Sequence, residues 1–343
     1  MDSHCSAHVT RTAVRLVTLI AAACCSLALI AGATAEASSL AVPPQQLDYF
    51  NSGQAIEPQS HTFADGGRAL YFDWSAPGVR PSVPRLLVFV VPGSGCTSMK
   101  YFFPGYFSGL NIPARFVALQ KRGIRVDGWG DGDECPRDFL ASDHPSRTLR
   151  DQVEFFEAMR ASVPDARVIV IGISEGAEIA ADMARSLPSV SALVLIGHGG
   201  VAPLTAYQLL LEKYKDKDKS GQSSMTIAAV TSPMIGDNEL VHGRSARYWR
   251  ETFALKTDET LLALPIPIWI AVGERDASMP IEAADLMQQR IARQAHKSIR
   301  IVRFPGADHA LCAPDRCYMR EFFVTLARQL RAEILADKGA SGL

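Results

Sequence analysis

The chain has 343 residues, of which 48% are hydrophobic and 21% charged, and its formal net charge is −1 at pH 7. This near-neutral balance produces no long-range field, and no basic stripe with interleaved aromatic residues follows the first 37 residues. Nucleic acid is therefore not expected as a partner. The remaining length is enough for one large core, or for one core with an insertion.

The first 37 residues have the pattern of a secretory signal peptide. An apolar stretch from Leu16 to Ala31 follows two arginines and precedes the cleavage pattern Ala33-Thr34-Ala35. A retained membrane anchor, or lipid modification of Cys24 or Cys25, is the alternative, but the stretch is short and no basic cluster follows it. We predict an exported protein, periplasmic or secreted, without stable membrane insertion once the leader is removed.

Apolar runs alternate with helical patterns through most of the chain that follows. The runs predicted as strands are Arg68–Trp74, Leu86–Val91, Phe116–Leu119, Val168–Ile171, Ala192–Ile196, Ile268–Val272 and Ile299–Phe304. The predicted helices are Arg147–Ala161, a helix directly after Ser174, Ile281–Gln294 and Arg316–Leu335. Strands and helices in turn predict an α/β fold, in which a mostly parallel central sheet is covered by helices on both faces.

A segment of about seventy residues near the middle of the chain does not fit this alternation. It holds two amphipathic pieces, near Ala206–Tyr214 and Ser245–Leu255, and a run of mixed charge typical of a solvated helix end. We interpret it as a cap inserted after the sixth strand. The predicted organisation is a signal peptide (1–37), an irregular lead-in (38–66), a core (67–199 and 264–337), a cap (200–263) and a flexible tail (338–343).

The most informative motif is the pentapeptide Gly172-Ile173-Ser174-Glu175-Gly176, a G-x-S-x-G sequence. It directly follows the apolar run Val168–Ile171 and directly precedes a helical pattern. A serine on a sharp strand-to-helix turn projects its hydroxyl clear of the backbone, and the flanking glycines avoid collisions there. The alternative is a glycine-bordered turn with an incidental serine. The placement favours a nucleophile at Ser174.

A serine nucleophile needs a base and an acid that orients the base, and both residue types follow predicted strands. Asp276 lies in Gly273-Glu274-Arg275-Asp276 after one strand, and His309 lies in Pro305-Gly306-Ala307-Asp308-His309 after the next. The carboxyl ends of parallel strands meet at one edge of the sheet, so these groups are expected to converge there. Glu274 is the alternative acid.

Backbone N–H groups are also needed for the developing oxyanion. The amide of Glu175, at the start of the helix after the nucleophile, is one predicted donor. The loop Pro92-Gly93-Ser94-Gly95-Cys96 follows a predicted strand, and we assign the second amide to Ser94 with Gly95 as the alternative. Gly95, and His198 at the end of another strand, are predicted to contact substrate; a structural role for His198 is the alternative.

Four cysteines remain after the leader: Cys96, Cys135, Cys312 and Cys317. An even number in an exported protein suggests two disulfides. Cys312 and Cys317 are five positions apart and form the easiest closure, which would leave Cys96 with Cys135. Other pairings, or four free thiols, are the alternatives. The spacings do not match metal-binding C-x-x-C pairs, so no metal site is predicted.

Together these motifs resemble the α/β-hydrolase superfamily over roughly residues 68–336. The chain order Ser174, Asp276, His309 is the order of that superfamily. The resemblance implies a Ser-His-Asp hydrolase that acts through an acyl-enzyme and needs no cofactor. Two features depart from the common pattern: Pro92-Gly93 stands where His-Gly is usual before the oxyanion position, and Glu175 stands where an apolar or amide residue is frequent.

The favoured function is an exported serine hydrolase that cleaves a small-molecule carboxylic ester or amide. A serine peptidase or aminopeptidase of the same fold is the alternative within this chemistry, and a non-catalytic binding protein that retains the fold is the alternative outside it. Four acidic residues, Asp127, Asp131, Asp133 and Glu134, are interpreted as solvated loop residues. If their loop reaches the pocket, they would favour a basic or hydroxyl-rich substrate.

Overall fold

The computed structural model describes residues 56–76, 79–80, 85–215, 227–228, 230, 232–294 and 298–335. The predicted signal peptide and flexible tail lie outside these residues, as does most of the predicted lead-in. In the described part, no helix is long and apolar enough to cross a membrane.

A central sheet of eight strands has the order β1-β2-β4-β3-β5-β6-β9-β10. Its strands are β1 (Gln59–Thr62), β2 (Arg68–Ser75), β3 (Leu86–Val91), β4 (Arg115–Leu119), β5 (Arg167–Ile173), β6 (Val190–Ile196), β9 (Ile268–Gly273) and β10 (Ile299–Phe304). All neighbours from β4 to β10 pair in parallel, whereas β1 and β2 form an antiparallel hairpin that joins β4 at the edge. The predicted mostly parallel sheet is confirmed.

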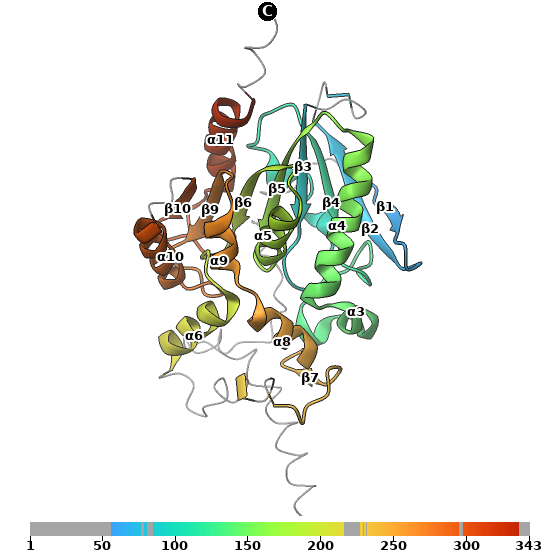
Figure 1. Ribbon diagram of the computed structural model, residues 1–343, viewed down its shortest axis with the longest axis vertical. Coiled ribbons are helices and arrows are strands. Elements are labelled where there is room, and N and C mark those ends of the chain that lie inside the picture. Colours follow the sequence, from blue (N-terminus) through green and yellow to red (C-terminus); the bar gives the residue numbers. More distant parts are fainter. Residues whose placement is uncertain are drawn as a thin grey trace, which may run out of the picture.

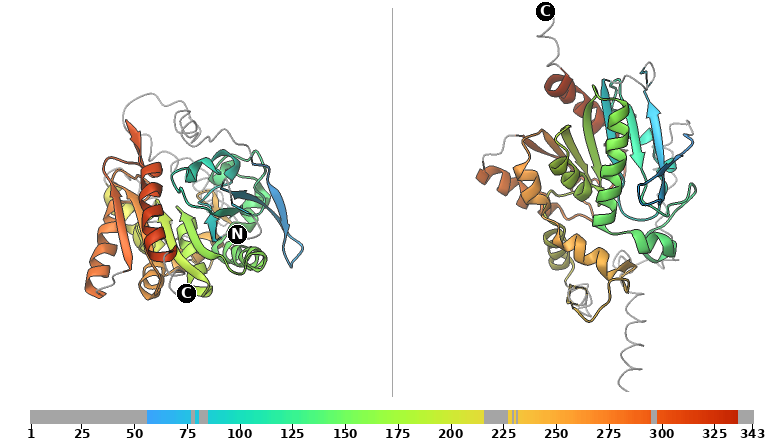
Figure 2. Two further views of the ribbon diagram at one scale, coloured as in Figure 1. Left: turned by 90° about the horizontal axis from the view of Figure 1, so that it is seen from above. Right: turned by 45° about the vertical axis from the view of Figure 1, so that its right-hand side comes forward.

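Helices cover both faces of the sheet, because alternate side chains of each central strand point to opposite sides. In β3, Leu87 and Phe89 belong to one core and Val88 and Val90 to the other. The first core is closed by α4 (Pro145–Ser162), α5 (Gly176–Ser186), α9 (Thr257–Ala263) and α10 (Ile281–Gln294). The second is closed by α11 (Met319–Leu330) and the 3-10 turns η1 (Met99–Tyr101) and η2 (Gly105–Phe107). Figures 1 and 2 show α4 and α5 together over the first face.

The elements between β6 and α9 gather at the end of the sheet where the parallel strands finish (Figure 1). They are α6 (Pro203–Tyr214), the short strands β7 (Leu240–Val241) and β8 (Arg244–Ser245), and α8 (Ala246–Ala254). Near them lie η3 (Gly132–Glu134) and α3 (Arg137–Ser142), and α3 contacts β8. We call the segment from α6 to α8 the cap segment. It sits over the edge at which loop residues from several strands can meet.

The structure differs from the sequence predictions at three boundaries. Strand β1 lies inside the predicted irregular lead-in, because its four residues pair with β2 despite their polar composition. Helix α9 lies inside the predicted cap, yet it packs against α5 and buries Leu261 in the first core. The last helix begins at Met319 because a small hairpin, β11 (Cys312–Ala313) and β12 (Arg316–Cys317), precedes it; a π-helical turn, η4 (Arg331–Leu335), follows it.

Candidate active site

Ser174 lies on the turn between β5 and α5 and has a left-handed backbone conformation, with φ of 53°. A non-glycine residue rarely adopts this conformation, and it is typical of a strained nucleophile turn. The turn is fixed by a hydrogen bond of 2.7 Å from the Ser174 amide to the carbonyl of Ile196 in β6. It also packs tightly against β3, because a Cβ at Gly176 would collide with the carbonyl oxygen of Val91.

His309 and Asp276 lie beside Ser174, after β10 and β9 respectively. The His309 Nε2 atom is 2.9 Å from the Ser174 Oγ, and His309 Nδ1 is 2.6 Å from Asp276 Oδ2. Asp276 is 2% exposed, and its other oxygen accepts hydrogen bonds of 2.8 Å from the amides of Ser278 and Met279. Because the Asp276 carboxylate accepts a hydrogen bond at Nδ1, the proton lies on Nδ1 and leaves Nε2 free to accept from the serine hydroxyl.

The alternative acid, Glu274, does not reach the histidine. Its side chain is exposed and lies 3.7 Å from the Arg303 guanidinium in an ion pair. The three residues that the sequence analysis assigns to nucleophile, acid and base are therefore the three that the structure brings together in one hydrogen-bonded chain.

The charge of Asp276 alters the titration of His309. Burial disfavours the imidazolium, but the hydrogen bond that His309 donates to Asp276 and the negative charges of Asp276 and Asp308 outweigh burial, so the pKa of His309 is raised above its ordinary value of 6.5. Protonated His309 cannot accept the serine proton. For a reaction that uses His309 as a base, activity is lost as the pH falls through this raised pKa.

Asp276→Asn is expected to lower the pKa of His309, because burial is then opposed only by the charge of Asp308. NMR titration of the His309 ring in both proteins measures the shift, and the acidic limb of the kcat/KM profile should move to lower pH with it. We also expect turnover to fall by roughly 10²- to 10⁴-fold, since the favoured tautomer is lost. An unchanged or higher His309 pKa in the variant would show that Asp276 does not act on this histidine.

The predicted oxyanion donors belong to the loop after β3 and to the nucleophile turn. The amides of Ser94 and Glu175 donate to no protein atom within the described ranges, which leaves both N–H groups available for a ligand. Gly93 brings the loop after β3 close to the nucleophile, because a Cβ there would lie 3.2 Å from the Ser174 Cβ. Gly95 lines the adjacent cavity as expected for a residue that contacts substrate, and its φ of 80° suits glycine.

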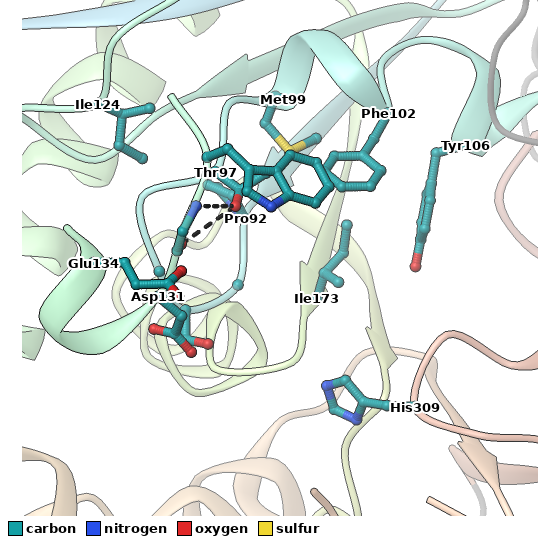
Figure 3. Close-up of a pocket in the computed structure, with 15 residues that line it drawn as sticks. Pro92, Thr97, Met99, Phe102, Tyr106, Ile124, Asp131, Glu134, Ile173 and His309 are labelled. Carbon is teal, nitrogen blue, oxygen red and sulfur yellow. Dashed lines mark hydrogen bonds between the residues drawn. The ribbon is translucent and has the colours of Figure 1, made fainter. Parts of the chain in front are cut away.

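A cavity of about 350 Å³ opens beside this loop, and His309 forms part of its wall (Figure 3). Apolar and aromatic side chains cover much of the wall; these are Met99, Phe102, Tyr106, Ile124, Trp129 and Ile173. At the other end, Asp131 and Glu134 lie together (Figure 3). Both residues are exposed, as expected of solvated loop residues, and both also line the cavity, so their loop reaches the pocket. None of the described residues that line the cavity is a lysine or an arginine.

His198 does not line this cavity, contrary to the sequence prediction that it contacts substrate. It is 1% exposed, and its Nε2 atom is 2.8 Å from the carboxylate of Glu178 in α5. Its Nδ1 accepts a hydrogen bond of 2.9 Å from the amide of Gly200, and the Thr257 hydroxyl donates to the same Glu178. Both ring nitrogens are therefore used, and His198 joins β6, α5 and α9 as a structural residue.

A cluster of buried charged residues around the side chain of Glu175 was not predicted from the sequence. The Glu175 carboxylate accepts hydrogen bonds from Lys121 and from the hydroxyl of Tyr248 in α8. Burial alone would raise the pKa of Glu175, but the charges of Lys121 and Arg244 and these two hydrogen bonds overcome burial and lower the pKa to about 2. Glu175 is therefore ionised at neutral pH.

Both cysteine pairs that the sequence favoured are present as disulfides. Cys96 is bonded to Cys135, and Cys312 to Cys317. The first ties the loop after β3 to the segment before α3, and the second closes the β11–β12 hairpin just beyond His309. Each therefore lies next to a loop that forms the site. In the described part of the chain, no group of His, Cys, Asp or Glu could hold a metal ion.

Comparison with known proteins agrees with this fold. Residues 152–333 match the family model described as "BAAT / Acyl-CoA thioester hydrolase C terminal". Similar solved structures include a carboxyl esterase from Bacillus coagulans (17% identity, TM-score 0.55, 82% of this chain and 99% of that chain). Est1E from Butyrivibrio proteoclasticus (14%, 0.54, 81% and 99%) and an acylaminoacyl peptidase from Pyrococcus horikoshii (15%, 0.54, 83% and 43%) are also similar. No curated protein sequence matches the chain. These likenesses confirm the α/β-hydrolase fold.

Proposed function

Because the chain belongs to the BAAT / acyl-CoA thioester hydrolase C-terminal family and is a hydrolase of the α/β-hydrolase type, we propose that it is an exported serine hydrolase that cleaves a carboxylic ester through an acyl-enzyme on Ser174. The observation that carries this proposal is the unbroken hydrogen-bonded chain from Ser174 through His309 to Asp276. Export is supported by the leader pattern and by the two disulfides, which persist in oxidising compartments.

In the proposed reaction, the Ser174 Oγ attacks the ester carbonyl while His309 Nε2 takes its proton. The amides of Ser94 and Glu175 stabilise the oxyanion of the tetrahedral intermediate. The carbon–oxygen bond to the alcohol then breaks, and the alcohol leaves with the proton from Nε2. Water repeats the sequence on the acyl-enzyme: His309 takes a proton from water, the acid is released, and the proton returns to Ser174. Asp276 keeps its charge throughout and stabilises the imidazolium.

The cavity supports an ester with an apolar group rather than a coenzyme A thioester. Met99, Phe102 and Ile173 offer an apolar surface to an acyl or alcohol group. Coenzyme A carries several phosphate charges, which would approach the carboxylates of Glu134 and Asp131. Arg244 pairs with Asp131, but no lysine or arginine is among the described residues that line the cavity. The acyl-CoA thioester in the family description is therefore the second candidate. A peptide or amide substrate is the third, and a similar fold occurs in the acylaminoacyl peptidase.

A substrate panel distinguishes these candidates. The purified protein without its leader is assayed with p-nitrophenyl butyrate, an aminoacyl p-nitroanilide, butyryl-CoA and the butyryl thioester of a small neutral thiol. We expect turnover of the p-nitrophenyl ester and of the neutral thioester, with much weaker turnover of butyryl-CoA. Preference for butyryl-CoA would identify a coenzyme A thioesterase, and preference for the anilide would identify a peptidase. A folded protein that turns over none of them would indicate a binding protein.

A further inference from the structure

The side chain of the residue after the nucleophile is anchored from two sides. One carboxylate oxygen of Glu175 accepts a hydrogen bond from the ammonium group of Lys121, two residues beyond the end of β4. The other accepts from the hydroxyl of Tyr248, which belongs to α8 of the cap segment. The side chains of Lys121 and Glu175 are 4% and 15% exposed, and Tyr248 is buried. The nucleophile turn is therefore joined directly to the central sheet and to the cap segment.

A second set of contacts holds these anchors in place. The Lys121 ammonium is 2.8 Å from Asp143 at the end of α3, and Asp143 in turn accepts from Arg244 in β8. Arg244 also pairs with Asp131 in the cavity wall. Among the buried members, the charges of Lys121 and Arg244 balance those of Glu175 and Asp143. Moving one member away from the others would leave a buried charge without its partner, which carries a large free-energy cost. This cost keeps the side chains of the cluster in place.

The backbone amide of Glu175 is one of the two proposed oxyanion donors, and it shares its Cα with this anchored side chain. Donors to an oxyanion stabilise the transition state best when they are held in position before the reaction. A small displacement of the donor amide lowers the reaction rate. We propose that the Glu175 carboxylate, held by Lys121 and by Tyr248 of the cap segment, is a positioning group for the oxyanion donor. This inference rests on the proposed serine hydrolase function of the same site.

The arrangement predicts which kinetic constant changes. Glu175, Lys121 and Tyr248 are not among the residues that line the cavity, so their side chains do not bind the ground-state substrate there. A displaced oxyanion donor acts in the transition state instead. Variants of this cluster are therefore expected to lower kcat and to leave KM nearly unchanged.

The test uses Tyr248→Phe and Glu175→Gln in the otherwise intact protein, with p-nitrophenyl butyrate as substrate. Active sites are first titrated with a fluorophosphonate, so that unfolded molecules are not counted. We expect kcat per titrated site to fall roughly 10-fold in Tyr248→Phe and roughly 10- to 100-fold in Glu175→Gln, with KM within about twofold. The double variant should lose little more than Glu175→Gln alone, since both changes break one contact.

Two control variants separate positioning from general loss of stability. Tyr71→Phe removes another tyrosine hydroxyl, which donates to Gln59 at the β1–β2 edge. Asp151→Asn removes another buried carboxylate. Asp151 lies on α4, and its Oδ2 atom is 2.6 Å from the Arg122 guanidinium. Asp151→Asn is expected to lower Tm, because it removes the more buried of the two carboxylates that pair with Arg122, while kcat per titrated site stays at the wild-type value in both controls.

Unchanged kcat per titrated site in Tyr248→Phe and Glu175→Gln would overturn the inference. A raised KM with unchanged kcat would overturn it as well, because the cluster would then act on binding. Tyr248→Phe removes a single oxygen atom, so it decides the question if Glu175→Gln does not fold. A wild-type protein without turnover or a titratable serine would overturn the proposed function together with this inference, whereas an active wild type with unaffected variants would overturn the inference alone.

Discussion

Ser174→Ala is expected to lower kcat for p-nitrophenyl butyrate by roughly 10⁴- to 10⁶-fold, because the acyl-enzyme cannot form without the hydroxyl. The remaining activity would come from the oxyanion donors and from substrate binding. The variant should fold like the wild type. Alanine keeps the Cβ atom, it accepts the same backbone conformation at φ of 53°, and the removed oxygen bonds only to His309 among the described residues. Circular dichroism and Tm measure the fold, and steady-state kinetics measure the loss.

Ser186→Ala is a matched control for this substitution. Ser186 ends α5, the helix that follows the nucleophile, and its hydroxyl donates to the carbonyl of Asp182 on the exposed side. The same chemical change on the same helix should leave turnover within a few-fold of the wild type. Wild-type turnover in Ser174→Ala would show that another residue attacks the substrate.

His309→Ala is expected to lower kcat by a similar factor, roughly 10⁴- to 10⁶-fold, since His309 alone among the described residues is placed to take the serine proton. The rate at which a fluorophosphonate labels Ser174 should fall with it, because that reaction needs the same activated hydroxyl. Loss of this partly exposed ring leaves a space that opens to the cavity. Added imidazole should therefore restore part of the activity, more at high pH than at low pH, because only the neutral form accepts a proton.

A loss of activity that imidazole does not relieve, together with a labelling rate equal to that of the wild type, would contradict the base role. Ser174 would then be activated by another group. Measurement of both rates across a series of imidazole concentrations separates this outcome from a general loss of folding, which Tm reports independently.

The residues proposed as nucleophile, acid and base could be located from the sequence because each follows a strand with a strong local signal. The runs Val168–Ile171, Ile268–Val272 and Ile299–Phe304 are apolar and β-branched, and parallel pairing brings their carboxyl ends to one edge whatever the details of the loops. The chain order of Ser174, Asp276 and His309 added a second constraint. These are local patterns combined with a topology rule, and they needed no tertiary detail.

The charged cluster around Glu175 could not be predicted in the same way. Its members come from the end of β4, the end of α3, the nucleophile turn and the cap segment, and no spacing in the sequence links them. Their pairing depends on how the cap segment docks onto the sheet. The unusual glutamate in the G-x-S-x-G motif was the one available signal, because a carboxylate in a turn that packs against β3 needs a buried partner.

The misplaced boundaries have physical causes of the same kind. Strand β1 is short and polar, and it is a strand because the hairpin partner β2 supplies its hydrogen bonds. Helix α9 carries acidic residues in its first turn and resembles a surface element, but Leu261 fills a site against α5. His198 stands at a strand end like the proposed catalytic residues. It is nevertheless buried and structural, because its ring hydrogen-bonds to Glu178 on the neighbouring helix. Each outcome follows from a contact distant in sequence.

The central claim is that Ser174 is an activated nucleophile, and covalent labelling tests it most directly. The purified protein without its leader is treated with a fluorophosphonate probe, digested, and mapped by mass spectrometry, beside Ser174→Ala and a heat-denatured sample. We predict a single phosphonate on the peptide that contains Ser174 in the native protein, and none in either control. Absence of label on Ser174 in the folded native protein, or label on a different residue, would contradict the account.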